Sequence, residues 1–221
     1  MRRDQLEHLI RAVGAIVHAD DVVVIGSQAI LASYGEAVLP GEATVSVGAD
    51  IVPLDDADGR RADLIDGAIG EASMFHETYG VYAQGAGLST ALLAPGWGER
   101  LVPLVDRSTG TTGWCLDVHD LCAAKLLAGR PKDRDFVAAI VGARRADSVE
   151  IARLLELAVA GEERRMAATA TLAQLEASGL PARSRRSWWR RRADALADQV
   201  RQAPRPRPVV GPDETPEAGS S

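Results

Sequence analysis

The run of residues 22–25 limits the possible folds of this sequence more than any other feature. It consists of three valines and an isoleucine in succession, and such a run suits a strand covered on both faces. Gly26 and Ser27 end the run, and residues 28–34 follow with a helical pattern. A buried strand that leads through a Gly-Ser turn into a helix indicates an α/β protein.

The remaining patterns alternate between helix and strand. Helical spacing of apolar residues predicts helices over residues 4–18, 61–72, 133–143, 147–160 and 162–178, and a further helix that Asp117 caps and that runs to residue 128. Strands are expected over residues 43–54, 79–84, 100–105 and 114–116, the last two as a hairpin across a Gly-rich loop. We therefore predict an α/β (α+β) fold in which helices flank a small mixed sheet of about four or five strands.

The chain is expected to divide into three parts. Residues 1–146 form the core, residues 147–202 form a helical extension that includes a basic helix over 184–202, and residues 203–221 form a disordered tail rich in proline. Of the 221 residues, 46% are hydrophobic, which is enough for one core of ordinary size.

The apolar stretches are too short or too often interrupted for membrane or export segments. No run approaches the roughly 18 apolar residues of a membrane helix, and Asp4, Glu7 and Arg11 interrupt the N-terminal apolar pattern. Cys115 and Cys122 lack metal-ligand spacing and are expected to be buried thiols in a reducing compartment. These observations predict a cytoplasmic protein with no membrane partner and no structural zinc.

A basic segment lies in an otherwise acidic chain. The net charge of −6 gives no overall attraction to nucleic acid, whereas residues 183–192 are rich in arginine. The side chains that can bind RNA there are Arg185, Arg186, Trp188, Trp189 and Arg190. Such residues stack on bases and hold phosphates, as a tRNA-binding surface does. Alternatively, the tryptophans pack on the body of the protein and the arginines pair with an acidic partner or stay in water.

Gly26 and Ser27 are candidates for binding phosphate. Backbone N–H groups at the start of a helix attract anions, and the hydroxyl of Ser27 adds a hydrogen-bond donor. The alternative is a tight turn without a ligand, because a strand, a Gly-Ser pair and a helix follow one another in many folds.

Asp50, on the next expected strand, is a candidate metal ligand. Enzymes that act on triphosphates use carboxylates to hold Mg²⁺, and two acids at positions i and i+2 of a strand point the same way and can share a metal site. A single aspartate near a strand is as often a surface residue or a turn former.

A cluster of charged residues lies between two expected helices. The run KLLAGRPKDRDF contains Lys125, Arg130, Lys132, Asp133, Arg134 and Asp135. A lysine on the inner side of a helix can neutralise a β- or γ-phosphate. By itself, the stretch from Arg130 to Asp135 also suits a charged turn in water, with side chains paired at i,i+3 and i,i+4.

The Gly-Ser turn, the acid-bearing strand and the run DLxxxKLxAGRxKDxDF, taken in this order, resemble the minimal nucleotidyltransferases. The chain is similar in particular to the AbiEii-like branch, whose best-known members are toxins of toxin–antitoxin systems, and the resemblance covers about residues 1–155. It implies a nucleotidyltransferase-like fold, with Asp50 and Lys125 as catalytic residues and Asp50 as the ligand of Mg²⁺. The residues implied to bind the nucleoside triphosphate (NTP) are Gly26, Ser27, Lys125, Arg130, Lys132 and Asp133, and Asp135 also matches the motif.

The sequence departs from the family at its Asp-x-Asp pair. Gly48 and Val52, two residues before and after Asp50, stand where the second acid is expected. The acids that can replace it are Asp55, Asp56, Asp63, Glu71, Glu77 and Asp117.

Three functions follow from this pattern. The first is an enzyme that transfers a nucleotide to RNA, such as tRNA, in a toxin–antitoxin or defence context with a cognate antitoxin as partner. The second is a catalytically degenerate fold that binds a nucleotide, RNA or a protein. The third is a small-molecule (aminoglycoside-type) nucleotidyltransferase, which the basic segment disfavours.

Two histidines lie beside carboxylates. His76 and Glu77 are expected at the start of a strand, either as an acid–base pair or, more simply, as an exposed pair at the strand end. His119 follows Asp117 at a helix N-terminus, where we expect a structural role.

Overall fold

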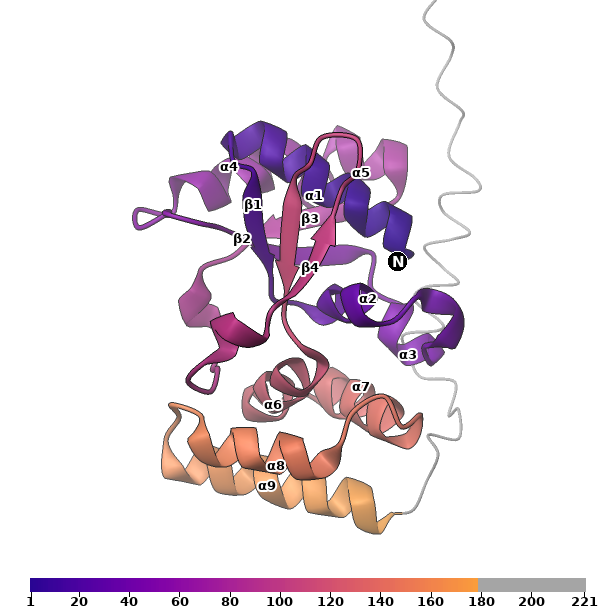
Figure 1. Ribbon diagram of the computed structural model, residues 1–221, viewed down its shortest axis with the longest axis vertical. Helices are drawn as coiled ribbons and strands as arrows, with labels where there is room; N and C mark the ends of the chain where they lie inside the picture. Colours follow the sequence, from indigo (N-terminus) through magenta and orange to yellow (C-terminus); the bar gives the residue numbers. More distant parts are fainter. Residues whose placement is uncertain (179–221) are drawn as a thin grey trace, which may run out of the picture.

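The computed structural model describes residues 1–178 of the 221-residue chain (Figure 1). The basic helix expected over residues 184–202 and the tail expected over 203–221 lie outside the described residues. So do the side chains expected to bind RNA, which are Arg185, Arg186, Trp188, Trp189 and Arg190.

The described part of the chain combines α-helices with one sheet. The helices are α1 (Arg3–Val17), α2 (Ile30–Ser33), α3 (Gly41–Thr44), α4 (Arg60–Ile69), α5 (Met74–Tyr79), α6 (Val118–Ala128), α7 (Pro131–Gly142), α8 (Ser148–Leu157) and α9 (Glu162–Ala177). The strands are β1 (Asp21–Val24), β2 (Gly48–Pro53), β3 (Tyr82–Gly85), β4 (Val102–Val105) and β5 (Thr112–Cys115). The short 3₁₀ turn η1 (Ser27–Ala29) connects β1 to α2.

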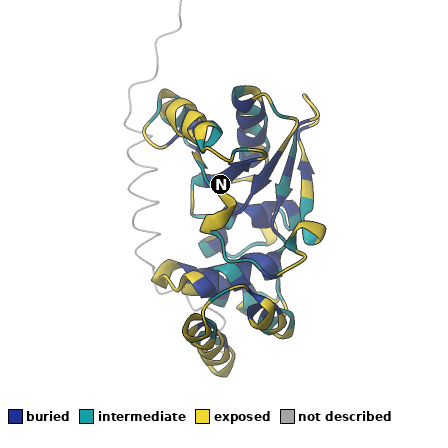
Figure 2. Cartoon of the chain, turned by 90° about the vertical axis from the view of Figure 1, so that its left-hand side faces the viewer, coloured by how far each residue is buried: buried dark blue, intermediate teal, exposed yellow. Residues whose placement is uncertain are grey.

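The five strands form one mixed sheet in the order β3-β2-β1-β5-β4. β1 pairs in parallel with β5 and antiparallel with β2, and β3 lies parallel to β2. β4 and β5 form the antiparallel hairpin that the sequence predicts. The expected α/β (α+β) fold is confirmed, and the valine run is its buried central strand (Figure 2).

Glycines on one face of the sheet allow α1 and α4 to pack closely against it (Figure 1). A Cβ atom at Gly113 of β5 would lie 2.3 Å from the side chain of Ile10 in α1. A Cβ atom at Gly85 of β3 would lie 2.2 Å from the backbone oxygen of Ala62 in α4. A larger residue at Gly85 would therefore push α4 off the sheet, and one at Gly113 would require the side chain of Ile10 to move.

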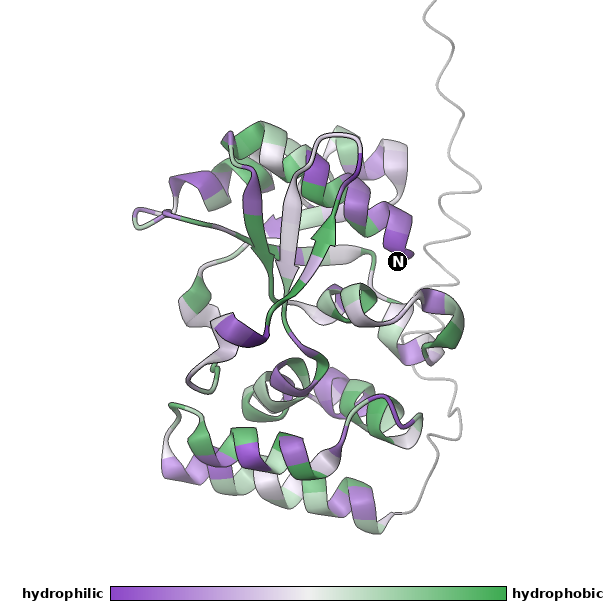
Figure 3. Cartoon of the chain, in the orientation of Figure 1, coloured by the Kyte–Doolittle hydropathy of each residue, from purple (hydrophilic) through white to green (hydrophobic). Residues whose placement is uncertain are grey.

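Helices α8 and α9 pack against α6 as a further layer (Figure 1). Both helices mix polar and apolar residues along their length (Figure 3), and the apolar side of α8 is buried through Ile151, Leu154 and Leu155. The two helices expected over residues 147–160 and 162–178 are thus present, and they bury their apolar sides against the core.

The strand expected over residues 43–54 is shorter than predicted. Its first residues form α3 instead, and β2 begins at Gly48. The N–H of Ala43 donates to the carbonyl of Pro40, and the Ala43 side chain is buried. Tertiary packing of this turn outweighs the weak strand pattern of the residues that follow Pro40.

The assignment of His76 and Glu77 to a strand is wrong. Both residues belong to α5, because the side chain of Ser73 accepts a hydrogen bond from the N–H of His76 and so caps this helix. Gly80, with φ of 70°, ends it, and β3 begins only at Tyr82.

Cys115 and Cys122 are free and buried, as expected, and burial raises the pKa of each thiol to about 12. Within residues 1–178, no helix is long and apolar enough to cross a membrane.

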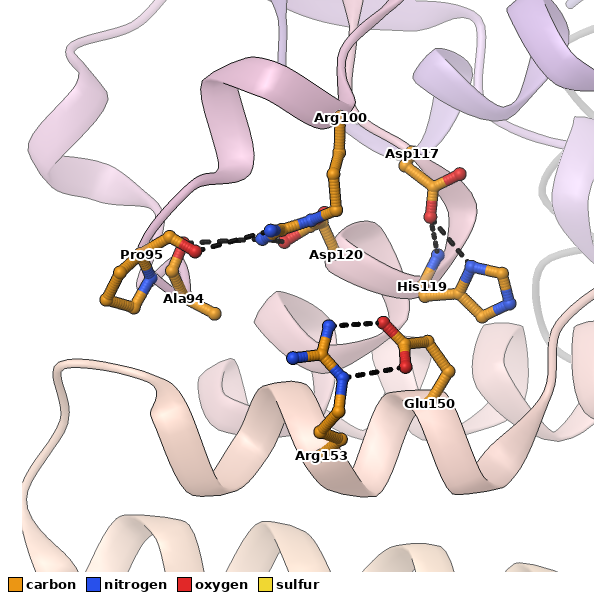
Figure 4. Close-up of polar contacts among 8 residues, drawn as sticks. All are labelled: Ala94, Pro95, Arg100, Asp117, His119, Asp120, Glu150 and Arg153. Carbon is orange, nitrogen blue, oxygen red and sulfur yellow. Dashed lines mark hydrogen bonds and ion pairs between the residues drawn. The ribbon is translucent and has the colours of Figure 1, made fainter.

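Arg100 ties the segment before β4 to α6 through a buried carboxylate (Figure 4). Its guanidinium donates hydrogen bonds of 2.7 and 2.8 Å to Asp120 and contacts the carbonyl oxygens of Ala94 and Pro95. Asp120 is only 1% exposed, so its charge depends on this partner. The Arg153–Glu150 pair in the same view is exposed on α8.

Replacing Arg100 by alanine should therefore destabilise the protein by about 3 kcal/mol, because Asp120 would stay buried without a compensating cation. The exposed pair supplies the matched control, since Arg153→Ala should cost less than about 1 kcal/mol. Urea unfolding followed by circular dichroism measures both. Equal losses in the two variants would contradict this account.

Candidate functional site

A cavity of about 530 Å³ lies where the carboxyl end of β1 meets β2, β3, α6 and α7. The residues that the resemblance assigned to the nucleotide site line it, namely Gly26, Ser27, Asp50, Lys125, Arg130, Lys132, Asp133 and Asp135. Residues up to 109 positions apart in the chain therefore meet at one place, from Gly26 to Asp135.

Gly26 and Asp50 are in direct contact at the floor of the cavity. A Cβ atom at Gly26 would lie 1.9 Å from an oxygen of the Asp50 carboxylate, so only glycine leaves room for this side chain. The N–H of Ile25 donates a hydrogen bond of 3.0 Å to the backbone oxygen of Asp50 and joins the two strands there. The Gly-Ser turn and the aspartate therefore form one structural unit.

Asp133 organises the positively charged wall of the cavity. It is completely buried and accepts a hydrogen bond of 2.9 Å from Lys125 in α6 and one of 2.5 Å from Arg130. The ammonium of Lys125 also lies 4.6 Å from the centre of the Phe136 ring. The stretch from Arg130 to Asp135 is thus not merely a charged turn in water, because its central acid is part of the core.

These contacts shift the ionisation of the cluster. Burial lowers the pKa of Lys125, and the attraction of Asp133 offsets only part of that effect. Burial opposes ionisation of Asp133, but the hydrogen bond from Arg130 and the charge of Lys125 outweigh it and lower the pKa of Asp133. The ammonium of Lys125 and the carboxylate of Asp133 lie at salt-bridge distance, 2.9 Å apart.

Nearby cations compensate the charge of Asp50 less well than they compensate the charge of Asp133. Burial raises its pKa above the ordinary 3.8, and the nearby charges of Lys125, Lys132 and Arg130 offset only part of this effect. A partly buried carboxylate whose charge is only partly compensated is suited to binding a cation.

Neither position beside Asp50 suits a second acid as the chain is folded. A Cβ atom at Gly48 would lie 2.4 Å from the ring of Tyr82 in β3. Val52 is buried in the core. An acid at position 48 would therefore require Tyr82 to move, and one at position 52 would bury a charge in the apolar core.

Most of the acids that could replace the missing partner of Asp50 lie outside the cavity. Asp56 accepts hydrogen bonds from the N–H groups of Arg61 and Ala62 at the start of α4, and Asp117 caps α6 by accepting from the N–H of His119. Asp55, Asp63 and Glu77 do not line the cavity, whereas Glu71 does. Two further carboxylates that line the cavity are Glu42 and Asp135.

Among the lining residues that the sequence analysis did not assign to the site are His76, Tyr82 and Gln84. Register explains two of them, because Gly48 pairs with Tyr82 and Asp50 with Gln84 across the parallel strands. His76 follows from α5, which the sequence analysis placed in a strand. His119 has the structural role that was expected, and its hydrogen bond to Asp117 raises its pKa.

Gln28 is an unusual neighbour of the Gly-Ser turn. Its side chain is fully buried, and neither its amide nitrogen nor its amide oxygen has a hydrogen-bond partner within residues 1–178. Burying an unpaired amide is costly, so this residue destabilises the fold.

The chain matches a known family over most of its described length. Residues 4–171 match the model of a family described as "Nucleotidyltransferase of unknown function (DUF6036)". This match includes every residue that lines the cavity. No curated protein and no solved structure matched the chain.

The unpaired amide leads to a stability prediction. Gln28→Met should stabilise the protein by about 1 kcal/mol, because it keeps the side-chain volume and removes the unsatisfied polar atoms. The control is Gln84→Met at an exposed position, which should change stability by less than about 0.5 kcal/mol. A loss of stability in Gln28→Met, measured by urea unfolding, would show that the amide is satisfied.

The raised pKa of Asp50 leads to a pH prediction. Its stabilising contribution is complete below pH 3.8, where the carboxyl group is protonated, and is lost as the pH rises through the folded-state pKa. Asp50→Asn should therefore be more stable than the wild type at pH 7, and the difference should shrink as the pH falls toward 4. Asp135→Asn, an exposed acid of the same cavity, is the control for the loss of one charge and should change stability little. Thermal unfolding across this pH range checks both; an Asp50→Asn variant that is less stable at pH 7 would contradict the burial argument.

Proposed function

This chain belongs to the nucleotidyltransferase family whose model it matches, and on that premise we propose that its cavity binds an NTP with Mg²⁺ and that the protein transfers the nucleotide to a hydroxyl group. One observation carries the proposal. Gly26, Asp50 and Lys125, which are distant in the sequence, line the same cavity.

The charges of the cavity favour the phosphates of the ligand. Lys125, Arg130 and Lys132 bring positive charge to the wall formed by α6 and α7. Gly26 lies against the Asp50 carboxylate, and Ser27 adds a hydroxyl donor next to it. The triphosphate would lie between these two groups, with its terminal phosphates toward the lysines and Arg130.

Asp50 would hold the metal together with the nucleotide. Within residues 1–178, no group of three or more histidines, cysteines and acids has metal-site geometry, so the protein alone offers few ligands. Mg²⁺ in such sites is commonly bound by one or two carboxylates plus the phosphates of the substrate. Asp50 fits that pattern as the single carboxylate, and the metal would neutralise charge on the phosphates that react.

Transfer of the nucleotide would be a substitution at the α-phosphorus, in which the cationic residues act on the leaving group. A hydroxyl oxygen of the acceptor attacks the α-phosphorus, a new O–P bond forms, and the bond from that phosphorus to the pyrophosphate oxygen breaks. Pyrophosphate leaves with the electron pair, and Lys125, Arg130 and Lys132 stabilise its charge. The hydroxyl proton passes to water.

For the acceptor and the biological setting, we propose RNA, such as tRNA, in an AbiEii-like toxin–antitoxin or defence system. The support is the resemblance of the motif run and the arginine-tryptophan segment over residues 183–192, which suits single-stranded nucleic acid. A cognate antitoxin protein would be a further partner.

The packing of Tyr82 over Gly48 favours a second candidate function. Because this packing excludes the paired acid, a nucleotide-binding protein without transfer activity would also fit the cavity. A Mg²⁺-dependent transfer of label from an NTP to RNA, lost in Asp50→Asn, would rule it out.

Calorimetric titration tests binding directly. Each of the four NTPs is titrated with and without Mg²⁺, and Mg²⁺ is also titrated alone. We expect binding of an NTP with Mg²⁺ and none of Mg²⁺ alone, because the phosphates supply most of the metal ligands. Absence of binding for all four NTPs would overturn the proposal.

One lysine variant and one arginine variant on α7 sharpen this test. Lys132→Ala removes a positive charge that lines the cavity and should weaken NTP binding about tenfold. Arg134→Ala removes an exposed positive charge two residues further on, outside the cavity, and should leave the affinity nearly unchanged. Lys132 is the better choice than Lys125, whose removal would leave the buried Asp133 with fewer partners. Equal effects of the two variants would mean that the nucleotide does not lie in this cavity.

A further inference from the structure

Tyr82 is held against the floor of the cavity by the backbone of β2. Its ring lies so close to Gly48 that a Cβ atom there would be 2.4 Å from Cζ and 2.7 Å from the hydroxyl oxygen. The N–H of Tyr82 also donates a hydrogen bond of 3.1 Å to the carbonyl of Val47. Gly48 therefore fixes the position of an aromatic ring that lines the cavity.

His76 adds a second ring beside it. The ring centres of His76 and Tyr82 are 4.8 Å apart, and both side chains line the cavity. The N–H of Ala72 donates a hydrogen bond of 3.1 Å to Nδ1 of His76. A neutral ring with an occupied Nδ1 carries its proton on Nε2, so His76 is a hydrogen-bond donor and not a free general base.

The two rings lie at a suitable place relative to the phosphate groups. Tyr82 pairs with Gly48, and Gly48 is two residues before Asp50 on the same face of β2, a separation of about 7 Å along the strand. Gln84 pairs with Asp50, so it lies beside the carboxylate on the neighbouring strand, two residues beyond Tyr82, and is exposed to the cavity. On the other side of Asp50 lie Gly26 and the charged wall that contains Lys125.

We propose that Tyr82 and His76 form a nucleobase-binding subsite, on which the base of the NTP stacks while its phosphates lie beyond Asp50. This inference rests on the proposed NTP site. Aromatic side chains bind bases through stacking, and the Nε2–H of His76 supplies a donor for a ring nitrogen or carbonyl of the base. Gln84, whose amide both donates and accepts, lies beside Asp50 and offers hydrogen bonds to the ribose. The site thus selects nucleoside triphosphates over ligands that carry phosphates alone.

Affinity for ligands with and without a base tests the subsite. The wild-type protein is titrated in the presence of Mg²⁺ with ATP, ribose 5′-triphosphate and inorganic triphosphate. ATP should bind roughly tenfold more tightly than the two ligands that lack a base. This comparison needs no variant, so it does not depend on how well a variant folds.

Two substitutions at Tyr82 complete the test. Tyr82→Leu removes the ring and should weaken ATP binding roughly tenfold while the affinity for inorganic triphosphate changes less than about twofold. Tyr82→Phe keeps the ring and should retain most of the ATP affinity. Circular dichroism confirms that each variant is folded.

The outcomes separate this inference from the proposed function. If the wild-type protein binds ATP and inorganic triphosphate equally well, the base subsite is wrong and the phosphate site stands. If Tyr82→Leu lowers the affinity for ATP and for inorganic triphosphate to the same extent, the ring has a structural role and the subsite is wrong. If the wild-type protein binds none of the ligands, the proposed NTP site itself fails, and the subsite with it.

Discussion

The buried carboxylate of Asp133 is the constraint on which the charged side of the cavity depends. It compensates Lys125 from one helix and Arg130 from the turn that precedes the next. Gly129 ends α6 with φ of 69°, and Pro131 begins α7, so the chain turns sharply enough for these groups to meet. Because an unpaired charge in this position would be costly, the salt bridge, the turn and the angle between α6 and α7 are maintained together.

On the other side of the cavity, packing is arranged around Asp50 at a cost to stability. Gly26 has no side chain, which leaves room for the carboxylate of Asp50, and burial raises the pKa of Asp50. Gln28, next in the chain after Ser27, buries an amide without partners within the described residues. Such local costs concentrate at functional sites, where the rest of the fold must supply the stability to support them. These costs support the proposal that the Gly-Ser turn is part of a binding site.

Much of this arrangement could be predicted from the sequence, and the failures have specific causes. The valine run, the β4–β5 hairpin and the Asp117 cap depend on local patterns, and the structure confirms them. α5 was missed because a single capping serine, Ser73, outweighs the strand-like residues after it. Tyr82 and Gln84 were missed because their place in the cavity depends on the register between β2 and β3, which is set by packing of distant segments. For Asp133, the sequence left a charged surface turn open beside a place in the nucleotide site, because it does not show that Lys125 reaches this acid across the helix break.

The register of β2 and β3 also connects the absent acid with the aromatic pair. An acid at position 48 would clash with Tyr82, so the chain can have a carboxylate pair or this ring beside Asp50, but not both in the present packing. A site with one carboxylate relies on its ligand to complete the metal shell, which requires the ligand to be held firmly by other contacts. A stacked base provides such contacts at a distance from the reacting phosphorus. The ring that occupies the place of the second acid would thus compensate for its loss by fixing the nucleotide.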